Sequence, residues 1–182
     1  MRLSKEDWLK LGINILTKYG PEAIKIERLC AGMNVTKGSF YHHFAHRDDF
    51  IACLLDFWQE QNTQAIIAQV DTIAEIEARS DKLDFLARHT DTGPEVAIRA
   101  WAQFDVQVAA RVKAVDEQRL AYLEHLIGSL VPQKDNARLM AQIAYAHFVG
   151  AQHLTGLIAP DEWAAMDSFL RSLMLNVTTI EK

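Results

Sequence analysis

Apolar residues recur at helical spacing from the beginning of the chain. Between Ser4 and Tyr19 they return every three or four residues, which predicts an amphipathic helix. Ser4 and Asp7 have the spacing of a capping box, and Gly20, which can adopt a left-handed conformation, precedes Pro21. We therefore expect the first helix to begin after Ser4 and to end at Gly20.

Two shorter helical segments follow, over residues 24–33 and 37–44. Asn34 lies between them, and asparagine tolerates a left-handed turn better than other non-glycine residues. Phe40 and Phe44 are four residues apart, so both are expected to face the core and to leave hydrogen-bond donors on the outer face. Two short helices joined by a tight turn, the second exposing donors and little bulk, predict a helix-turn-helix.

The rest of the chain predicts a bundle of about six helices. Helices are expected over 47–76, from 80 to the loop at 91–94, from 95 to 130 with a break near Asp105, over 135–159 and over 161–176. The predicted fold class is therefore all-α. A three-helix N-terminal domain is expected over residues 1–46, and a helical C-terminal domain over residues 47–182.

Charge is distributed unevenly between these two parts. The 182 residues are 49% hydrophobic and 24% charged, with a formal net charge of -5, which argues at first against a nucleic-acid partner. Residues 1–50 contain 8 Lys and Arg against 6 Asp and Glu, whereas residues 51–182 contain 11 against 18. The first 50 residues are thus mildly basic, and the overall acidity does not exclude DNA binding by this part.

Other features indicate a soluble protein of a reducing compartment. Cys30 and Cys53 lie in apolar helical patterns and are expected to be free thiols, Cys30 as a small buried hydrophobic side chain. No secretory signal opens the chain, and no apolar run reaches the roughly 18 residues of a membrane-spanning helix. The expected location is the cytoplasm, with no membrane partner.

The segment from Leu29 to Phe44, followed by Arg47-Asp48-Asp49-Phe50, resembles the DNA-binding domain of TetR-family transcriptional regulators. The family pattern is an alanine-rich helix, Gly-Val-Ser, Gly-Ser/Thr-Leu-Tyr-x-His-Phe, and a Lys or Arg that opens the next helix. The resemblance covers residues 4 to about 50. Cys30, Asn34 and Phe40 replace the usual alanine, glycine and leucine, and none of these changes removes a DNA-facing group.

The resemblance implies a set of DNA-contacting residues. Three of them would face the base edges of the major groove: Lys37, Gly38 and His42. The others would mainly contact phosphates: Lys25, Thr36, Ser39, Tyr41, His43 and Arg47. Gly38 costs about 1 kcal/mol relative to Ala inside a helix, which is reasonable where the helix must approach another surface closely. Phosphate contacts also imply that binding weakens steeply with salt.

The resemblance also implies roles for the C-terminal domain, namely ligand sensing and dimerisation. Candidate pocket residues are Phe57, Trp58, Gln61, Trp101, Phe104, Tyr122 and Phe148. Candidate residues of a dimer interface formed by the last two helices are Ala146, Gly150, His153, Trp163, Met166, Leu170 and Leu173. The alternative for every residue in both sets is ordinary core packing within one chain.

The leading hypothesis is a homodimeric repressor that binds a palindromic operator on double-stranded DNA and is released by an unknown small-molecule effector. One alternative is a helical interaction protein that does not bind DNA. An enzyme is the other, although no known catalytic motif occurs. His42 and His46 have metal-ligand spacing but lack a nearby third ligand, so neither a metal nor a cofactor is expected. Tyr41 taken alone could equally be a core aromatic residue with its hydroxyl at the surface.

Overall fold

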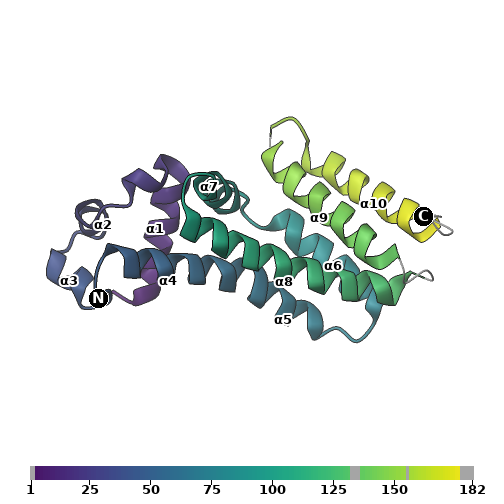
Figure 1. Ribbon diagram of the computed structural model, residues 1–182, viewed down its shortest axis with the longest axis horizontal. Coiled ribbons are helices and arrows are strands. Elements are labelled where there is room, and N and C mark those ends of the chain that lie inside the picture. The colour runs from purple at the N-terminus through teal and green to yellow at the C-terminus, as the bar shows by residue number, and fades with distance from the viewer. Residues whose placement is uncertain (1–2, 132–135, 155, 177–182) are drawn as a thin grey trace. The chain divides into compact units, whose positions relative to one another are not determined.

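The computed structural model describes residues 3–131, 136–154 and 156–176, which are helical and include no strand (Figure 1). This confirms the all-α prediction. The helices are α1 (Lys5–Tyr19), α2 (Ile26–Met33), α3 (Lys37–Tyr41), α4 (Arg47–Gln59), α5 (Ala65–Asp71), α6 (Ile76–His89), α7 (Gly93–Ala102), α8 (Val106–Leu130), α9 (Ala137–His153) and α10 (Pro160–Asn176). None of the described helices is both long enough and apolar enough to cross a membrane.

The ends of the first helices are fixed by local hydrogen bonds and turn residues. The Asp7 amide donates to Ser4 Oγ at 3.2 Å and the Ser4 amide to Asp7 Oδ2 at 2.8 Å, which confirms the capping box. Asn34 has φ 54° and ψ 48°, the predicted left-handed turn between α2 and α3. Gly20 ends α1 with φ 76° and ψ 176°, so its φ is positive but its ψ lies outside the left-handed helical region that was expected, and glycine adopts this conformation readily.

Two predicted boundaries in the middle of the chain were wrong. The helical run that begins with α4 continues through a π-helical turn (Glu60–Gln64) but ends with α5, short of residue 76. α6 begins at Ile76, four residues before Ser80. Ser80 is buried inside the helix and does not cap it. The turn before α6 is closed instead by the Arg79 guanidinium, which donates to the Ile73 carbonyl at 2.8 and 3.0 Å.

The later boundaries agree with the periodicity in part. The helix is interrupted around Asp105, between α7 and α8, as predicted. α9 ends at His153 rather than at residue 159, and its predicted start at Asp135 lies outside the described residues. α10 begins one residue before its predicted start.

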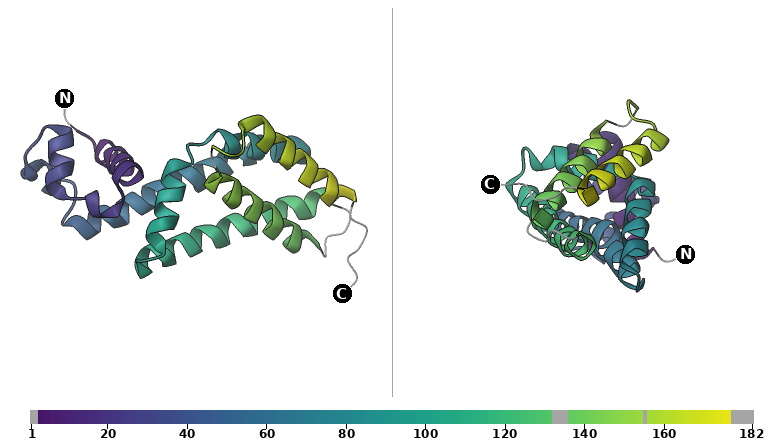
Figure 2. Two further views of the ribbon diagram at one scale, coloured as in Figure 1. Left: turned by 90° about the horizontal axis from the view of Figure 1, so that it is seen from above. Right: turned by 90° about the vertical axis from the view of Figure 1, so that its right-hand side faces the viewer.

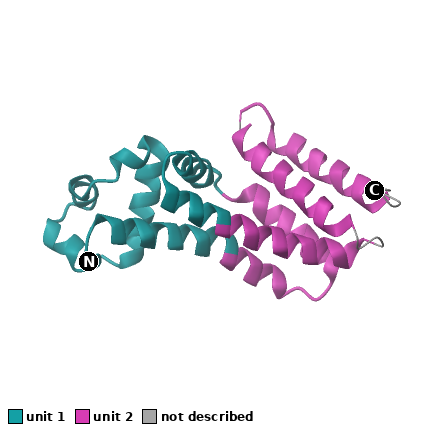
Figure 3. Cartoon of the chain, in the orientation of Figure 1, with its two compact units in different colours: residues 1–63, 91–113 teal, residues 64–90, 114–182 magenta. Residues whose placement is uncertain are grey.

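The chain divides into two compact units (Figure 3). Unit 1 comprises residues 1–63 and 91–113, and unit 2 comprises residues 64–90 and 114–182. α4, α7 and the first part of α8 thus group with the helix-turn-helix. The expected functional boundary after residue 46 remains a prediction, since compactness does not show where DNA contact ends and ligand sensing begins.

Close helix approaches position α1 within unit 1. A Cβ atom at Gly12 would lie 2.6 Å from Phe50 Cζ and 2.9 Å from Leu54 Cδ1, so α1 and α4 can meet this closely only because residue 12 is glycine. A Cβ atom at Gly93 would lie 2.7 Å from Thr17 Cγ2, which is the equivalent approach between α7 and α1. α1 is therefore held directly by both α4 and α7.

A buried carboxylate joins α4 to α7. Glu95 is 4% exposed, and its Oε2 accepts a hydrogen bond from Trp58 Nε1 at 3.2 Å while Oε1 accepts from Arg99 Nε at 2.8 Å. Burying a charge is costly unless it is paired and hydrogen-bonded, and both oxygens of Glu95 are engaged. Arg111 of α8 also forms an ion pair with Asp56 of α4, with Nη2 2.7 Å from Oδ1.

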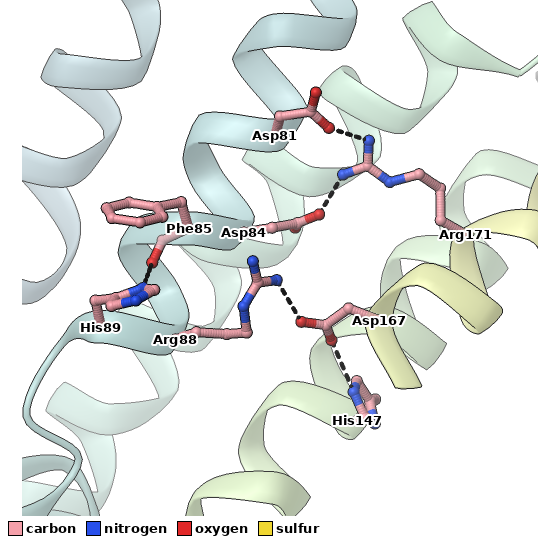
Figure 4. Close-up of polar contacts among 8 residues, drawn as sticks. All are labelled: Asp81, Asp84, Phe85, Arg88, His89, His147, Asp167 and Arg171. Carbon is pink, nitrogen blue, oxygen red and sulfur yellow. Dashed lines mark hydrogen bonds and ion pairs between the residues drawn. The ribbon is translucent and has the colours of Figure 1, made fainter. Parts of the chain in front are cut away.

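Ion pairs also connect the helices of unit 2 (Figure 4). Arg171 of α10 contacts both Asp81 and Asp84 of α6. Asp167 of α10 accepts from Arg88 Nη1 at 2.8 Å and lies 2.8 Å from His147 Nε2 of α9. Burial raises the pKa of Asp84, and Arg171 opposes this effect. These contacts fasten α10 to α6 and α9.

We expect Gly12→Ala to lower the free energy of unfolding by about 1–3 kcal/mol, because the added methyl group would overpack two fully buried side chains. Gly128→Ala in α8 is the matched control, since its Cβ would make only an ordinary 3.5 Å contact with Ala137 Cβ. That variant should gain up to about 1 kcal/mol from helix propensity. Urea unfolding at one protein concentration compares the variants, and a Gly12→Ala protein as stable as the parent would contradict the packing described.

Candidate DNA-binding surface

Helix α3, which the sequence predicts to be the recognition helix, is held in place by aromatic packing. It has five residues, and isolated helices of this length are not stable in water. Phe40 is fully buried, with its ring 5.6 Å from that of Trp8 in α1 and 5.8 Å from that of Phe50 in α4. Phe44 follows α3 and lies 4.9 Å from Phe50 and 5.2 Å from Phe40. The prediction that Phe40 and Phe44 face the core is confirmed.

The outer face of α3 consists of residues predicted to contact DNA. Thr36, Lys37, Gly38, Tyr41 and His42 are exposed. Ser39 and His43 are partly buried. A Cβ atom at Gly38 would come no closer than 3.6 Å to Thr36 Oγ1, so internal packing does not require glycine at this position. Because glycine has no side chain, nothing protrudes from the exposed face of α3 at Gly38.

Tyr41 lies at the edge of the aromatic cluster. Its ring centroid is 5.6 Å from that of Phe40 in an edge-to-face arrangement, yet Tyr41 is 54% exposed. It is therefore not a core residue, and its ring rests on the core while much of its surface faces outward. This orientation is compatible with a phosphate contact by the hydroxyl group.

The histidines around α3 have different surroundings. The ring of His43 is 6.5 Å from that of Trp8 and 5.0 Å from that of His42. His46 caps α4, because its Nδ1 accepts from the Asp49 amide at 3.1 Å. Within the described residues, no three His, Cys, Asp or Glu side chains are placed to hold a metal ion.

Arg47 and Lys25 lie beside the turn that precedes α2. Arg47 Nε donates to the Ile24 carbonyl at 2.7 Å, and the Arg47 side chain remains 41% exposed. Arg47 thus positions the start of α4 as well as being a candidate phosphate contact. Lys25 is exposed at the N-cap position of α2. Thr36 occupies the N-cap position of α3 but makes no side-chain capping bond.

Glu27, which helical spacing did not single out, is an acidic residue on this mainly basic surface. Lys37 Nζ lies 2.5 Å from Glu27 Oε1. The hydrogen bond from Lys37 lowers the pKa of Glu27, and the same bond raises the pKa of Lys37, so both groups are charged at neutral pH. Spacing within one helix could not reveal this pair, because Glu27 is in α2 and Lys37 in α3. Nearby, burial raises the pKa of the Cys30 thiol, as expected of a small buried side chain.

The candidate pocket residues do not form a single cluster within either unit. Five are in unit 1: Phe57, Trp58, Gln61, Trp101 and Phe104. Two are in unit 2: Tyr122 and Phe148. Trp58 and Trp101 are buried, Phe57 is partly buried and Gln61 is exposed.

Two of these candidates have surroundings that the helical pattern did not predict. Phe104 is 93% exposed in the turn between α7 and α8, so it does not line an interior cavity of the single chain. The Tyr122 hydroxyl donates to Asp71 Oδ1 at 2.8 Å, and partial burial together with this bond raises the pKa of Tyr122 to about 12. Periodicity identified both residues as apolar or aromatic, but it could not distinguish the core, the surface and a pocket.

The candidate interface residues are mostly exposed on α9 and α10, which lie side by side (Figure 2). The exposed members are Ala146, Gly150, His153, Met166 and Leu173, and Leu170 is partly exposed. Trp163 is only 8% exposed and its ring is 6.4 Å from that of Phe148, so it belongs to the chain's own core. The prediction omitted four large exposed apolar side chains of these helices, Leu139, Ile143, Phe169 and Leu175, and also Leu154 directly after α9.

Part of the chain is similar in sequence to a known regulator. The chain is 29% identical over 84 residues to an uncharacterised HTH-type transcriptional regulator, YwcC, of Bacillus subtilis (strain 168). That alignment covers 46% of this chain and 37% of the relative, so the chain matches well under half the length of that protein. No model of a protein family matches the chain.

Solved structures match over nearly the whole chain. SCO4454, a TetR-family transcriptional regulator from Streptomyces coelicolor, superposes with a TM-score of 0.78 at 16% identity, covering 94% of this chain and 89% of that one. A TetR transcription regulator from Haloarcula marismortui superposes with a TM-score of 0.72 at 17% identity, covering 92% and 94%. This chain has the fold of the TetR-family transcriptional regulators, and the resemblance seen around α3 is thereby confirmed at the level of the fold.

Proposed function

We propose that this protein is a DNA-binding transcriptional regulator that inserts α3 into the major groove. The observation that carries the proposal is the construction of α3 and the residues directly after it, where Phe40 and Phe44 are buried while amino, hydroxyl and imidazole groups face outward. A major groove about 12 Å wide admits a helix of this kind. The regulators with the same fold support the proposal.

Each exposed group has a suitable role in this arrangement. Lys37 and His42 carry donors for base edges, and Gly38 permits close approach of the backbone. The hydroxyl and imidazole groups at Ser39, Tyr41 and His43 suit phosphate oxygens, which position the helix without reading sequence. Lys25, Thr36 and Arg47 extend these phosphate contacts to the starts of α2, α3 and α4.

Homodimerisation through α9 and α10 forms part of the proposal. Leu139 and Ile143 of α9, and Leu154 directly after it, continue the exposed apolar spacing of Ala146 and Gly150. On the adjacent α10, Met166, Phe169 and Leu173 have the spacing of one helix face and are 41–65% exposed. Two such stripes on neighbouring helices match the four-helix interface of the TetR family. A symmetric dimer would also suit the paired half-sites of a palindromic operator.

Repression that is relieved by a small molecule completes the proposal. α1 packs directly against α4 and α7, and the Glu95 network ties α4 to α7. An effector that binds more tightly to one arrangement of α4 and α7 would therefore shift the position of α1 and, through Trp8 and Phe40, that of α3. The cytoplasm, where such a protein would meet DNA, is the proposed location.

The alternatives have less support. A helical interaction protein that does not bind DNA would have no need for the donors on α3 or for an exposed glycine within the helix. For catalysis, an enzyme needs a positioned acid, base or nucleophile in a pocket, and the prominent ionised groups of unit 2 described above are engaged in ion pairs between helices.

Replacing Lys37 or Tyr41 with alanine should weaken binding to a duplex from the protein's own promoter region by about 10-fold or more. Both side chains are exposed, so neither change disturbs the core. Fluorescence anisotropy with the labelled duplex measures the affinity. Lys82→Ala in α6 is the charge-matched control. If both variants bind as tightly as the parent, α3 is not the recognition helix.

Phe169→Asp should convert the dimer into a monomer, because it places a charge in the centre of the proposed apolar interface. Phe85→Asp makes the same change at a 47% exposed phenylalanine of α6 and should leave the dimer intact. Light scattering coupled to size exclusion should give the parent twice its chain mass of 20.6 kDa. A monomeric parent, or a Phe169→Asp protein that stays dimeric, would refute the proposed interface.

A further inference from the structure

An acidic side chain and a lysine meet on the surface beside α3. Glu27 lies in the first turn of α2, and Lys37 is the first residue of α3. The left-handed Asn34 and the bond from the Val35 amide to the Cys30 carbonyl, at 3.0 Å, form the turn between the two helices. The side chains of Glu27 and Lys37 remain 67% and 56% exposed, although their charged groups are 2.5 Å apart.

Glu27 is unfavourable for general attraction to DNA, because a carboxylate repels phosphate. It also neutralises much of the field of Lys37, the lysine of α3. A carboxylate accepts hydrogen bonds and never donates them at neutral pH. In the major groove it can therefore pair only with an exposed amino group, and it is penalised opposite a base edge that presents acceptors alone.

The pair keeps unused hydrogen-bonding capacity on both sides. The contact uses Oε1 of Glu27, and the Oε2 atom adds further acceptor positions. The Lys37 ammonium has three donors, of which Glu27 takes one. A C·G base pair presents the cytosine N4 amino donor next to the guanine O6 and N7 acceptors, which is the complementary arrangement.

We propose that Glu27 is a specificity-determining residue that, together with Lys37, reads a C·G base pair in each half-site. Glu27 accepts from cytosine N4, and Lys37 donates to guanine O6 or N7. The inference rests on the proposed DNA binding and adds to it a residue outside α3. It also assigns a function to a carboxylate that would otherwise only lower the affinity of the surface for DNA.

Selection from a pool of random-sequence duplexes tests this role. The parent should enrich a motif with one strongly preferred C·G pair per half-site, and Glu27→Ala should enrich the same motif with that preference lost. Glu22→Ala is the control, because it removes an equal charge from an exposed position outside α2 and α3. It should alter overall affinity while leaving the motif of the parent unchanged.

Affinity measurements on two defined duplexes complete the test. These are the selected duplex and the same duplex with the preferred C·G pair replaced by T·A. The parent and Glu22→Ala should discriminate between them by about 10-fold, whereas Glu27→Ala and the Glu27→Ala/Lys37→Ala double variant should discriminate less than about 2-fold. Circular dichroism confirms that each variant is folded.

The possible failures are distinguishable. If Glu27→Ala retains the motif and the discrimination of the parent, Glu27 is only a surface ion-pair partner and the inference is overturned. The inference is also overturned if Glu27→Ala and Glu22→Ala change the affinity for all duplexes by the same factor. If the folded parent retains no duplex even at low salt, the proposed DNA binding itself is wrong.

Discussion

The candidate site depends on the aromatic cluster that anchors α3. A five-residue helix forms too few hydrogen bonds to persist alone, so its existence follows from the burial of Phe40 and Phe44 against Trp8 and Phe50. These residues come from three separate segments, and the cluster therefore fixes where α3 lies relative to α1 and α4. Because the apolar residues of α3 point inward, its polar groups form one continuous outer face.

The position of that cluster depends in turn on glycine contacts in unit 1. Gly12 lets α1 approach Phe50, a member of the cluster, and Gly93 brings α7 equally close to Thr17. The buried Glu95 then joins α7 to α4. The helix-turn-helix is thus continuous in its packing with α4 and α7. A shift of α4 or α7 would therefore be transmitted to α3 through packed side chains.

The acidic residues of the C-terminal part contribute to the structure as well as to the net charge. Some of the acidic residues of 51–182 tie helices together, through Asp81 and Asp84 with Arg171 and through Asp167 with Arg88. In the basic N-terminal segment, by contrast, Glu27 lies on the exposed surface beside Lys37. The overall charge of -5 therefore averages over carboxylates with quite different surroundings.

Local signals in the sequence predicted the local structure well. The capping box at Ser4, the left-handed turn at Asn34 and the inward orientation of Phe40 each depend on residues close in sequence. Ser80 misled the prediction because a potential capping residue can also be buried within a helix. The exposure of Phe104, the burial of Trp163 and the Glu27–Lys37 contact arise between distant segments, so helical periodicity could not reveal them.

The most direct test of the central claim is an NMR titration of the ¹⁵N-labelled protein with duplex DNA from its own promoter region. If α3 is the recognition helix, the largest amide shift changes should fall on residues 36–42, with smaller changes at residue 25 and at the start of α4. Amides in the middle of α10 should change little. Shift changes centred outside the helix-turn-helix, or none at saturating duplex and low salt, would contradict the account.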